Sequence, residues 1–242
     1  MGGATLFIAD LHLDGARPHI IECFAKFLRV DAGDADALYI LGDLYEYWLG
    51  DDDPAAALQP TIGALAALTA RGVPVYFIHG NRDFLIGREF AKQSGCTLLP
   101  EASVIDLYGE PTLIMHGDTL CTDDKSYQSF RKKIRHPLTR KLLLSLSVNM
   151  RRKIAGGLRG QSRQAVGEKR PRIMDVNAQA VEDVMRQRGV RRLIHGHTHR
   201  PAVHALNIDG RSAIRYVLGD WYEQGSVLRC TPWGCELTSL PV

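Results

Sequence analysis

Five short segments of this chain place aspartate, asparagine or histidine at the end of an apolar run, and these residue types bind divalent metal ions. The segments are Asp10-Leu11-His12, Gly42-Asp43, Gly80-Asn81-Arg82-Asp83, His116-Gly117-Asp118 and Gly196-His197-Thr198-His199. Imidazole combined with carboxylate and amide oxygens, without thiolate, favours Mn, Fe, Co or Zn over Ca. We therefore expect the five segments to form one metal site.

The candidate ligands are too numerous for a single ion. They are Asp10, His12, Asp43, Asn81, His116, His197 and His199. This number fits two ions that share a carboxylate, and two ions about 3.5–4 Å apart are the usual arrangement for displacement at phosphorus. The ligand set therefore favours phosphoryl chemistry at a two-metal centre.

The apolar runs that precede the segments are of the kind found in buried strands. They cover residues 6–9, 38–41, 75–78, 113–115 and 193–194. In layered α/β folds, sites form on loops at strand ends, where glycines permit sharp turns. Period two points Asp10 and His12 the same way, and His197 and His199 would share a direction if locally extended. We expect an α/β fold in which each such pair can bind one ion.

Each segment alone also has an ordinary structural interpretation. Asp-x-His and Gly-Asp sequences are usually turns or helix caps, and His116 could be a buried histidine with a structural hydrogen bond. Arg82 could pair with the neighbouring Asp83. Five such segments in order are hard to explain as turns, so the metal site is the better interpretation.

The ordered segments resemble the calcineurin-like metallophosphoesterase superfamily over residues 4–120 and 190–220. Longer matches resemble one family within it, the UDP-2,3-diacylglucosamine pyrophosphatases of lipid A biosynthesis, over almost the whole chain. These matches are Asp10-Leu11-His12-Leu13, Leu41-Gly42-Asp43-Leu44-Tyr45-Glu46, Gly50-Asp51-Asp52, His79-Gly80-Asn81-Arg82-Asp83-Phe84-Leu85-Ile86-Gly87, Met115-His116-Gly117-Asp118, His195-Gly196-His197-Thr198-His199-Arg200-Pro201 and Leu218-Gly219-Asp220-Trp221. The resemblance implies a four-layer αββα core and two Mn²⁺ ions, with other divalent transition metals as substitutes.

The resemblance also divides the ligands between the ions. One ion would bind Asp10, His12, Asp43 and His199, and the other Asp43, Asn81, His116 and His197. The implied catalytic residues are Asn81, Arg82, His116 and His197. Asn81 and His197 would contact both metal and phosphate, and the guanidinium of Arg82 matches phosphate oxygens.

The reaction implied by the resemblance is attack of metal-activated water on the α-phosphorus of UDP-2,3-diacylglucosamine. The products would be UMP and 2,3-diacylglucosamine 1-phosphate (lipid X). Asp124, Ser162 and Lys169 fall where the family contacts this nucleotide-sugar lipid. Val166 stands where relatives carry a polar residue, so that contact is not carried over.

Charge is distributed unevenly along the chain. The net charge is +3, yet residues 131–172 hold 14 of the 30 Lys and Arg and a single acid, Glu168. This segment therefore carries +13, and the remainder carries 16 minus 26, or −10. A basic module interrupts an acidic core.

The basic module is predicted to be helical, with Gly156-Gly157 as a break in its later part. Apolar residues recur at helical spacing and predict one stripe flanked by cations. They are Ile134, Leu138, Leu142, Leu146, Met150 and Ile154. The stripe could simply pack on the core, or it could form a lid over the site that lies on an anionic membrane surface. We expect a metallophosphoesterase core at 1–120 and 190–242, and a helical lid at 121–189.

Five cysteines form no C-x₂-C pair, and an odd number argues against a complete disulfide framework. No run approaches the length of a membrane span, and no signal peptide precedes the first strand. With the resemblance, we expect a monomer, peripheral on the cytoplasmic face of the inner membrane of a Gram-negative bacterium.

Two other functions fit parts of the sequence. A nuclease or phosphodiesterase of the same superfamily would keep the ligands and use the basic module on a nucleic acid backbone. That module has few aromatics for base stacking, so no nucleic acid partner is expected. A non-catalytic binding module with a vestigial site is disfavoured by the complete ligand set.

Overall fold

The computed structural model describes residues 3–53, 58–168 and 175–241, with the backbone alone for 159–168. The first of its two sheets has the strand order β11-β10-β1-β2-β3-β4. Its strands are β1 (Thr5–Ile8), β2 (Ala37–Ile40), β3 (Val75–Phe77), β4 (Thr97–Leu98), β10 (Gln224–Thr231) and β11 (Gly234–Pro241). Strands β1 to β4 run parallel, and β10 and β11 are antiparallel additions at one edge.

The second sheet has the order β5-β6-β7-β9-β8. Its strands are β5 (Ala102–Leu107), β6 (Glu110–Met115), β7 (Arg192–His195), β8 (Ala202–Ile208) and β9 (Arg211–Val217). Strands β6, β7 and β9 are parallel. The apolar runs predicted to be strands correspond to β1, β2, β3, β6 and β7, so this prediction is confirmed.

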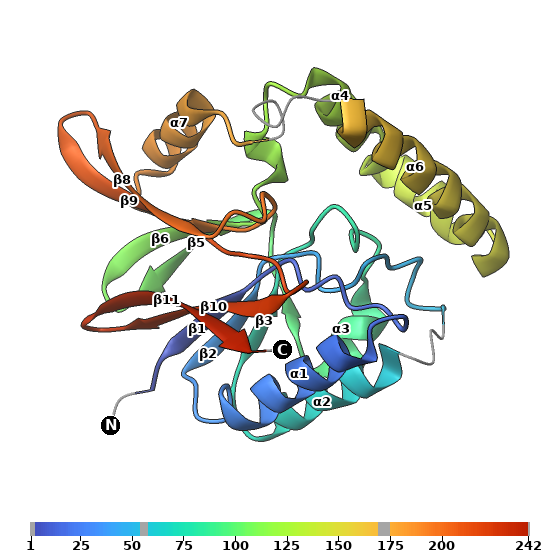
Figure 1. Cartoon of the computed structure of the whole chain (residues 1–242), viewed down its shortest axis with the longest axis horizontal. Helices are drawn as coiled ribbons and strands as arrows, with labels where there is room; N and C mark the ends of the chain where they lie inside the picture. Colours follow the sequence, from blue (N-terminus) through green and yellow to red (C-terminus); the bar gives the residue numbers. More distant parts are fainter. Residues whose placement is uncertain (1–2, 54–57, 169–174, 242) are drawn as a thin grey trace.

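Helices cover the outer faces of both sheets (Figure 1). Helices α1 (Pro18–Val30), α2 (Gln59–Ala70) and α3 (Arg88–Ser94) lie against the first sheet, and α7 (Ala178–Arg188) lies against the second. Buried apolar residues form three clusters, one between each pair of neighbouring layers. Three such interfaces make four layers, which confirms the predicted αββα core.

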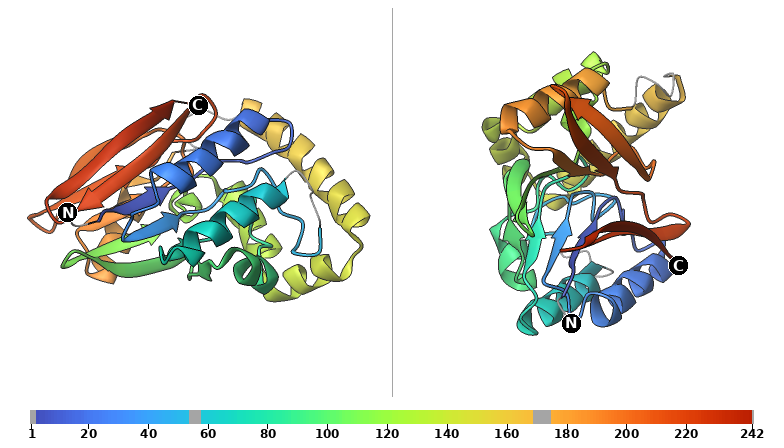
Figure 2. Two further views of the ribbon diagram at one scale, coloured as in Figure 1. Left: turned by 90° about the horizontal axis from the view of Figure 1, so that it is seen from below. Right: turned by 90° about the vertical axis from the view of Figure 1, so that its left-hand side faces the viewer.

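Three helices extend beyond the sandwich. They are α4 (Lys125–Ile134), α5 (Pro137–Ser145) and α6 (Val148–Glu168), and they follow the short 3-10 helix η2 (Asp118–Leu120). Figures 1 and 2 show them projecting at the end of the sheets where β1, β2 and β3 lead into the candidate loops. Among the residues that the structure describes, none of the helices is both long and apolar enough to cross a membrane.

The predicted single apolar stripe on the basic module is wrong. Helix α5 ends at Ser145 and Leu146 is extended, so the chain turns before α6 and the helical register is lost. Leu138 and Leu142 are exposed, whereas Ile134 and Ile154 are half-buried. The predicted break at Gly156-Gly157 is also wrong, because α6 continues through both glycines.

A disulfide joins Cys230 and Cys235, which face each other in the register of β10 and β11. The cysteine count did not predict this pair, because cross-strand neighbours are set by the hairpin and not by any spacing motif. Cys121 and Cys96 are buried and carry no disulfide in the structure.

Candidate metal centre

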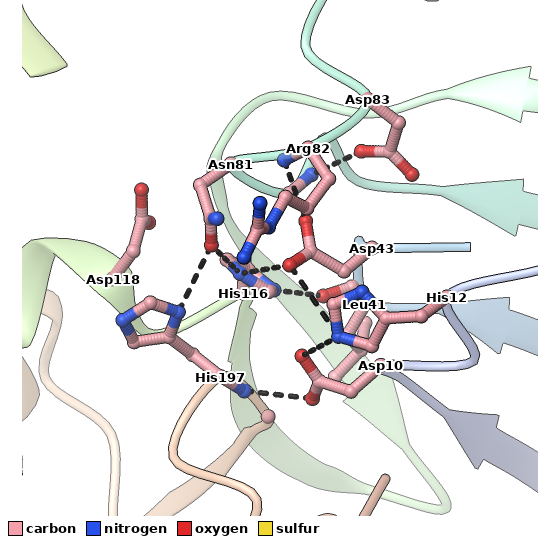
Figure 3. A network of polar contacts seen from close by, with 12 residues as sticks. Asp10, His12, Leu41, Asp43, Asn81, Arg82, Asp83, His116, Asp118 and His197 are labelled. Atoms are coloured by element: carbon pink, nitrogen blue, oxygen red, sulfur yellow. Dashed lines mark hydrogen bonds and ion pairs between the residues drawn. The ribbon is translucent and has the colours of Figure 1, made fainter. Parts of the chain in front are cut away.

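The candidate ligands converge where the strands of both sheets end. Figure 3 shows Asp10, His12, Asp43, Asn81, His116 and His197 together, and His199 contacts His12. Asp10, His12 and Asp43 follow β1 and β2, and Asn81 follows β3. The other three are His116 after β6, and His197 and His199 after β7. His12 and His199, which are 187 positions apart in the sequence, thus lie in contact.

Five of these residues have left-handed backbone conformations. They are Asp10, His12, Asp43, His197 and His199, with φ between 50° and 72°. Non-glycine residues rarely adopt this region, and such strain is concentrated at functional sites. Neither predicted pair is therefore extended. His197 and His199 point to different ends of the cluster, so the extended conformation under which they would share a direction is absent.

One end of the cluster contains Asp10, His12 and His199. The Nε2 atoms of His12 and His199 lie 3.2 Å apart, and His199 Nε2 lies 3.4 Å from Asp10 Oδ1. The backbone N–H of His197 donates to the other oxygen of Asp10 at 2.7 Å. Asp10 Oδ1 therefore remains directed at the two imidazoles.

The ring orientations at this end fit a bound cation. His12 Nδ1 lies 3.1 Å from Glu46 Oε2, and His199 Nδ1 lies 3.2 Å from Asp220 Oδ2. His199 Nδ1 is hydrogen-bonded to Asp220, whereas His12 Nδ1 lies beside Glu46 without hydrogen-bond geometry. If Nδ1 carries the proton in both rings, both Nε2 atoms present lone pairs to each other at 3.2 Å. Two facing lone pairs repel, and a shared cation removes this repulsion. The donor set at this end therefore fits a divalent metal ion.

The other end of the cluster contains Asn81, His116 and His197. Asn81 Oδ1 lies 3.0 Å from His116 Nε2 and 3.0 Å from His197 Nδ1. His116 Nδ1 lies 2.8 Å from the carbonyl oxygen of Leu41. Because a carbonyl oxygen only accepts, Nδ1 carries the proton and donates it, and Nε2 keeps its lone pair. The same orientation is typical of metal-ligating histidine.

Asp43 connects the two ends. Its Oδ2 lies 3.8 Å from His12 Nε2 and 3.8 Å from His116 Nε2, while Oδ1 accepts the N–H of Arg82 at 2.8 Å. The chain approaches closely here, since a Cβ added at Gly80 would lie 2.1 Å from Asp43 Oδ1. One carboxylate oxygen is thus placed between the two groups, as a shared ligand requires.

Asp83 holds the loop that carries Asn81 and Arg82. It is fully buried and accepts the N–H groups of Gly80 and Leu44, both at 2.8 Å. Burial and the nearby charge of Asp43 raise the pKa of Asp83 to about 7. The structure gives no ion pair between Asp83 and Arg82 within the described residues, so that interpretation of the sequence is not supported.

Charges within the cluster shift the pKa values of its members. Burial opposes ionisation of Asp10, but the hydrogen bond from His199 and the neighbouring histidines lower its pKa to about 2. Burial likewise opposes protonation of His199, yet Asp10 and Asp220 raise its pKa to about 10. Burial lowers the pKa of His197 to about 4. The first end of the cluster thus favours positive charge, either as a second proton on His199 or as a metal ion in place of that proton.

A cavity of about 610 Å³ lies between the cluster and helices α4 to α6. Asn81 and Arg82 line it on the core side, and Phe130, Ile134 and Ile154 are among its apolar lining residues on the helices. This volume is within the range of about 300–1,000 Å³ typical of small-molecule sites. The larger part of any ligand here would be in an apolar environment, with a polar end at Asn81 and Arg82.

Helix α4 is attached beside the cluster by a polar network. Tyr127 donates to Asp118 Oδ2 at 3.0 Å, and Arg131 Nε donates to the same oxygen at 2.6 Å. The ring of Tyr127 stacks on His197. Burial opposes ionisation of the Asp118 carboxyl, but the surrounding cations hold its pKa well below the usual range.

The three remaining predicted contacts have different outcomes. Asp124 is buried and caps α4, accepting the N–H of Tyr127 at 3.0 Å and the hydroxyl of Ser126 at 2.7 Å. The side chain of Ser162 and the whole of Lys169 lie outside the described residues. Substrate binding by these three residues therefore stays a prediction.

Sequence reasoning missed the carboxylates that orient the histidines. Asp220 was noted only within a matching motif, and Glu46 likewise. Asp220 nevertheless has the same signal as Asp43, an apolar run followed by Gly-Asp, here Tyr216-Val217-Leu218-Gly219-Asp220. Glu46 has no such signal, because its contact with His12 depends on the path of the loop after β2.

Comparisons with known proteins agree with this architecture. Residues 4–201 match the family model described as calcineurin-like phosphoesterase. The chain is 54% identical over 239 residues to the UDP-2,3-diacylglucosamine hydrolase of Salmonella arizonae, covering 99% of this chain and 100% of that protein. The protein of the same name from Salmonella typhi is similar to the same extent. A solved structure, a hypothetical protein from Pyrococcus horikoshii OT3, shares the fold at a TM-score of 0.50 and 11% identity, covering 99% of this chain and 88% of that one.

Proposed function

Because the chain belongs to the calcineurin-like phosphoesterase family, we propose that it hydrolyses the pyrophosphate bond of UDP-2,3-diacylglucosamine, giving UMP and 2,3-diacylglucosamine 1-phosphate. The observation that carries this proposal is the adjacency of two features. A cluster of seven metal-binding side chains opens into a cavity that is largely apolar and about 610 Å³ in volume. A substrate that joins a phosphate to acyl chains would place its polar part at the cluster and its apolar part in the cavity. The name of the relatives at 54% identity specifies this substrate class.

The proposed metal ligands follow the two ends of the cluster. One Mn²⁺ would bind Asp10, His12, Asp43 and His199, and a second would bind Asp43, Asn81, His116 and His197. The group Asp10-His12-His199 has ligand atoms within 4.8 Å of one another, which supports the first set. The group Asp10-Asp43-His116 meets the same limit, which supports Asp43 and His116 as neighbouring ligands, with Asp10 near both ends. When bound, such ions lower the pKa of water at the site and neutralise charge on phosphoryl oxygens.

The protein groups around the cluster orient the reaction. Arg82 would bind the phosphate oxygens through its guanidinium, since its backbone is fixed by the hydrogen bond to Asp43. Asn81 and His197, which face each other at 3.0 Å, would contact both metal and phosphate. The cavity beside Arg82 would exclude water from the acyl chains. Asp124, Ser162 and Lys169 are proposed contacts to the sugar nucleotide.

The cellular setting is part of the proposal. Leu138 and Leu142 are exposed on α5 within the basic module, which supports peripheral contact with an anionic membrane. We propose that the enzyme works as a monomer on the cytoplasmic face of the inner membrane. We also propose that residues 121–189 form its lid, separate from a core at 1–120 and 190–242.

The test is release of UMP from UDP-2,3-diacylglucosamine in the presence of Mn²⁺. We expect turnover by the wild type, and none after chelation or in the variant His116→Ala, which removes a proposed ligand. His19→Ala is the matched control, because His19 is exposed on α1 and should leave turnover unchanged. Metal-dependent cleavage of bis-p-nitrophenyl phosphate without UMP release would reject this substrate and favour a phosphodiesterase or nuclease of the same family.

A further inference from the structure

A second cavity of about 490 Å³ adjoins the Asp10-His12-His199 end of the cluster. His199, Asp220 and Tyr222 line it on one side, and residues of β10 and β11 on the other. The larger cavity reaches the cluster through Asn81 and Arg82 instead. Within the described residues, the two cavities share no lining residue. The metal-binding cluster therefore separates two distinct binding spaces.

We propose that the second cavity binds the uridine half of the substrate while the larger cavity holds the acylated sugar. This inference rests on the proposed function, in which the bond that breaks lies at the metal-binding cluster. A substrate bound there must extend in two directions from its pyrophosphate. The apolar lining of the larger cavity suits acyl chains, which leaves the second cavity for the nucleoside.

The lining of the second cavity suits a neutral, hydroxyl-rich and imide-bearing group. Besides His199, its polar side chains are carboxylates, hydroxyls and an amide, from Asp220, Tyr222, Glu223, Gln224, Ser226, Thr238 and Ser239. Lysine and arginine do not occur among the described residues that line it, so a free phosphate would find no cation there beyond the metal-binding end. Its volume lies within the range of about 300–1,000 Å³ typical of small-molecule sites.

Different side chains of the second cavity would bind the ribose and the base. Asp220 is committed to His199, and it also accepts the N–H of Tyr222 at 3.1 Å. The exposed Glu223 is then the carboxylate placed to accept hydrogen bonds from the ribose hydroxyls, a common role of acidic residues in nucleotide sites. The amide of Gln224 offers one donor group and one acceptor, which complements the imide edge of uracil.

Thr238 adds a preference for uracil. Its hydroxyl donates to the carbonyl oxygen of Val227 at 3.2 Å, so its oxygen is left as an acceptor. Uracil presents an N–H at position 3, whereas cytosine presents a lone pair there. An acceptor in the cavity wall would therefore favour uracil over cytosine.

The experiment compares binding of UMP and ribose 5-phosphate to the Mn²⁺-loaded chain by isothermal titration calorimetry. Both ligands carry the phosphate, so the difference between their Kd values isolates the base. Ser239→Trp fills the second cavity, and Glu236→Trp on the same strand is the control, because both residues are exposed and only Ser239 lines the cavity. We expect the wild type and the control to bind UMP about tenfold more tightly than ribose 5-phosphate. In Ser239→Trp this preference should vanish, with the Kd of ribose 5-phosphate unchanged.

A second, milder variant tests the same cavity in case Ser239→Trp does not fold. Gln224→Ala truncates an exposed side chain and should weaken UMP binding about fivefold without affecting ribose 5-phosphate. Equal affinities of the two ligands in the wild type would overturn the inference, as would a UMP preference that survives in both variants.

The same samples are assayed for UMP release from UDP-2,3-diacylglucosamine. A chain that prefers UMP through Ser239 and Gln224 but releases no UMP from the lipid would reject the proposed reaction and keep the nucleoside cavity. Turnover of the lipid without any preference for UMP would reject the cavity alone.

Discussion

Most of the candidate ligands have strained backbone conformations. Five of the seven have left-handed φ values, which non-glycine residues adopt at a cost of about 1–3 kcal/mol each. Such conformations persist only where the surroundings enforce them, and here the enforcing contacts are hydrogen bonds such as His197 N–H to Asp10. The positions of the candidate ligands are therefore built into the fold of the chain itself.

Asp83 is the residue whose loss should disturb this arrangement most without removing a ligand. In Asp83→Ala the N–H groups of Gly80 and Leu44 lose their acceptor inside the core, so we expect a destabilisation of about 2–4 kcal/mol. Urea unfolding measures the change. Asp14→Ala, which removes an exposed acceptor for the N–H of Ala16, should stay within about 0.5 kcal/mol of the wild type. A wild-type midpoint for Asp83→Ala would show that this carboxyl has no structural role.

At the same scale, the sequence predicted which residues meet but not how they are oriented. The seven ligands were predicted because each follows a strand, and strand ends of neighbouring parallel strands lie close together. The resemblance implied that His197 and His199 belong to different ions. Period-two spacing could not give this partition, since both residues leave the extended region. The carboxylates of Glu46 and Asp220 depend on loop paths, which no local pattern fixes.

Among the elements, the strands of the core were predictable and the helices beyond it only in part. Buried strands are short apolar runs, and this signal is local. Whether a leucine-rich segment forms one helix or two depends on tertiary contacts, and α5 ends at Ser145 although residues 142–144 are all leucine. Gly156 and Gly157 lie inside α6, although each glycine costs about 1 kcal/mol of helix propensity.

The anchor of α6 is Arg151, which is 3% exposed. Its guanidinium donates to the carbonyl oxygens of Leu49 and Leu146 and pairs with Asp52, so it joins the helix to the loop before residue 53. The neighbouring Arg152 pairs with Asp53 but is half exposed.

We therefore expect Arg151→Ala to loosen α5 and α6 by about 1–2 kcal/mol, since two carbonyls and a carboxylate lose their donor. Hydrogen exchange should become faster in α5 and α6 and stay unchanged in β1 to β3. Arg152→Ala is the matched control and should have the smaller effect. Uniform acceleration across the chain, or none in α5 and α6, would argue against a local anchor.

The whole molecule separates charge, with +13 on residues 131–172 and −10 on the rest. Leu138 and Leu142 are 71% and 64% exposed on α5, within this basic region. An exposed apolar pair surrounded by cations suits the surface of an anionic membrane.

The corresponding prediction concerns vesicles that contain anionic lipid. The double variant Leu138→Glu with Leu142→Glu should bind them at least about tenfold more weakly, because it removes apolar contact and adds negative charge. Val203→Glu is the control, since Val203 is 52% exposed on β8, away from α5 (Figure 1). Sedimentation with vesicles at low and high salt measures the effect. Equal loss in both variants would indicate no preferred membrane-facing surface.

In the proposed reaction, water attacks the α-phosphorus of UDP-2,3-diacylglucosamine at this candidate metal site. The most direct test is a single reaction in ¹⁸O-labelled water with Mn²⁺, followed by mass spectrometry of both products. The account predicts the label in UMP and none in 2,3-diacylglucosamine 1-phosphate. Label in the lipid phosphate, or the absence of both products, would contradict it.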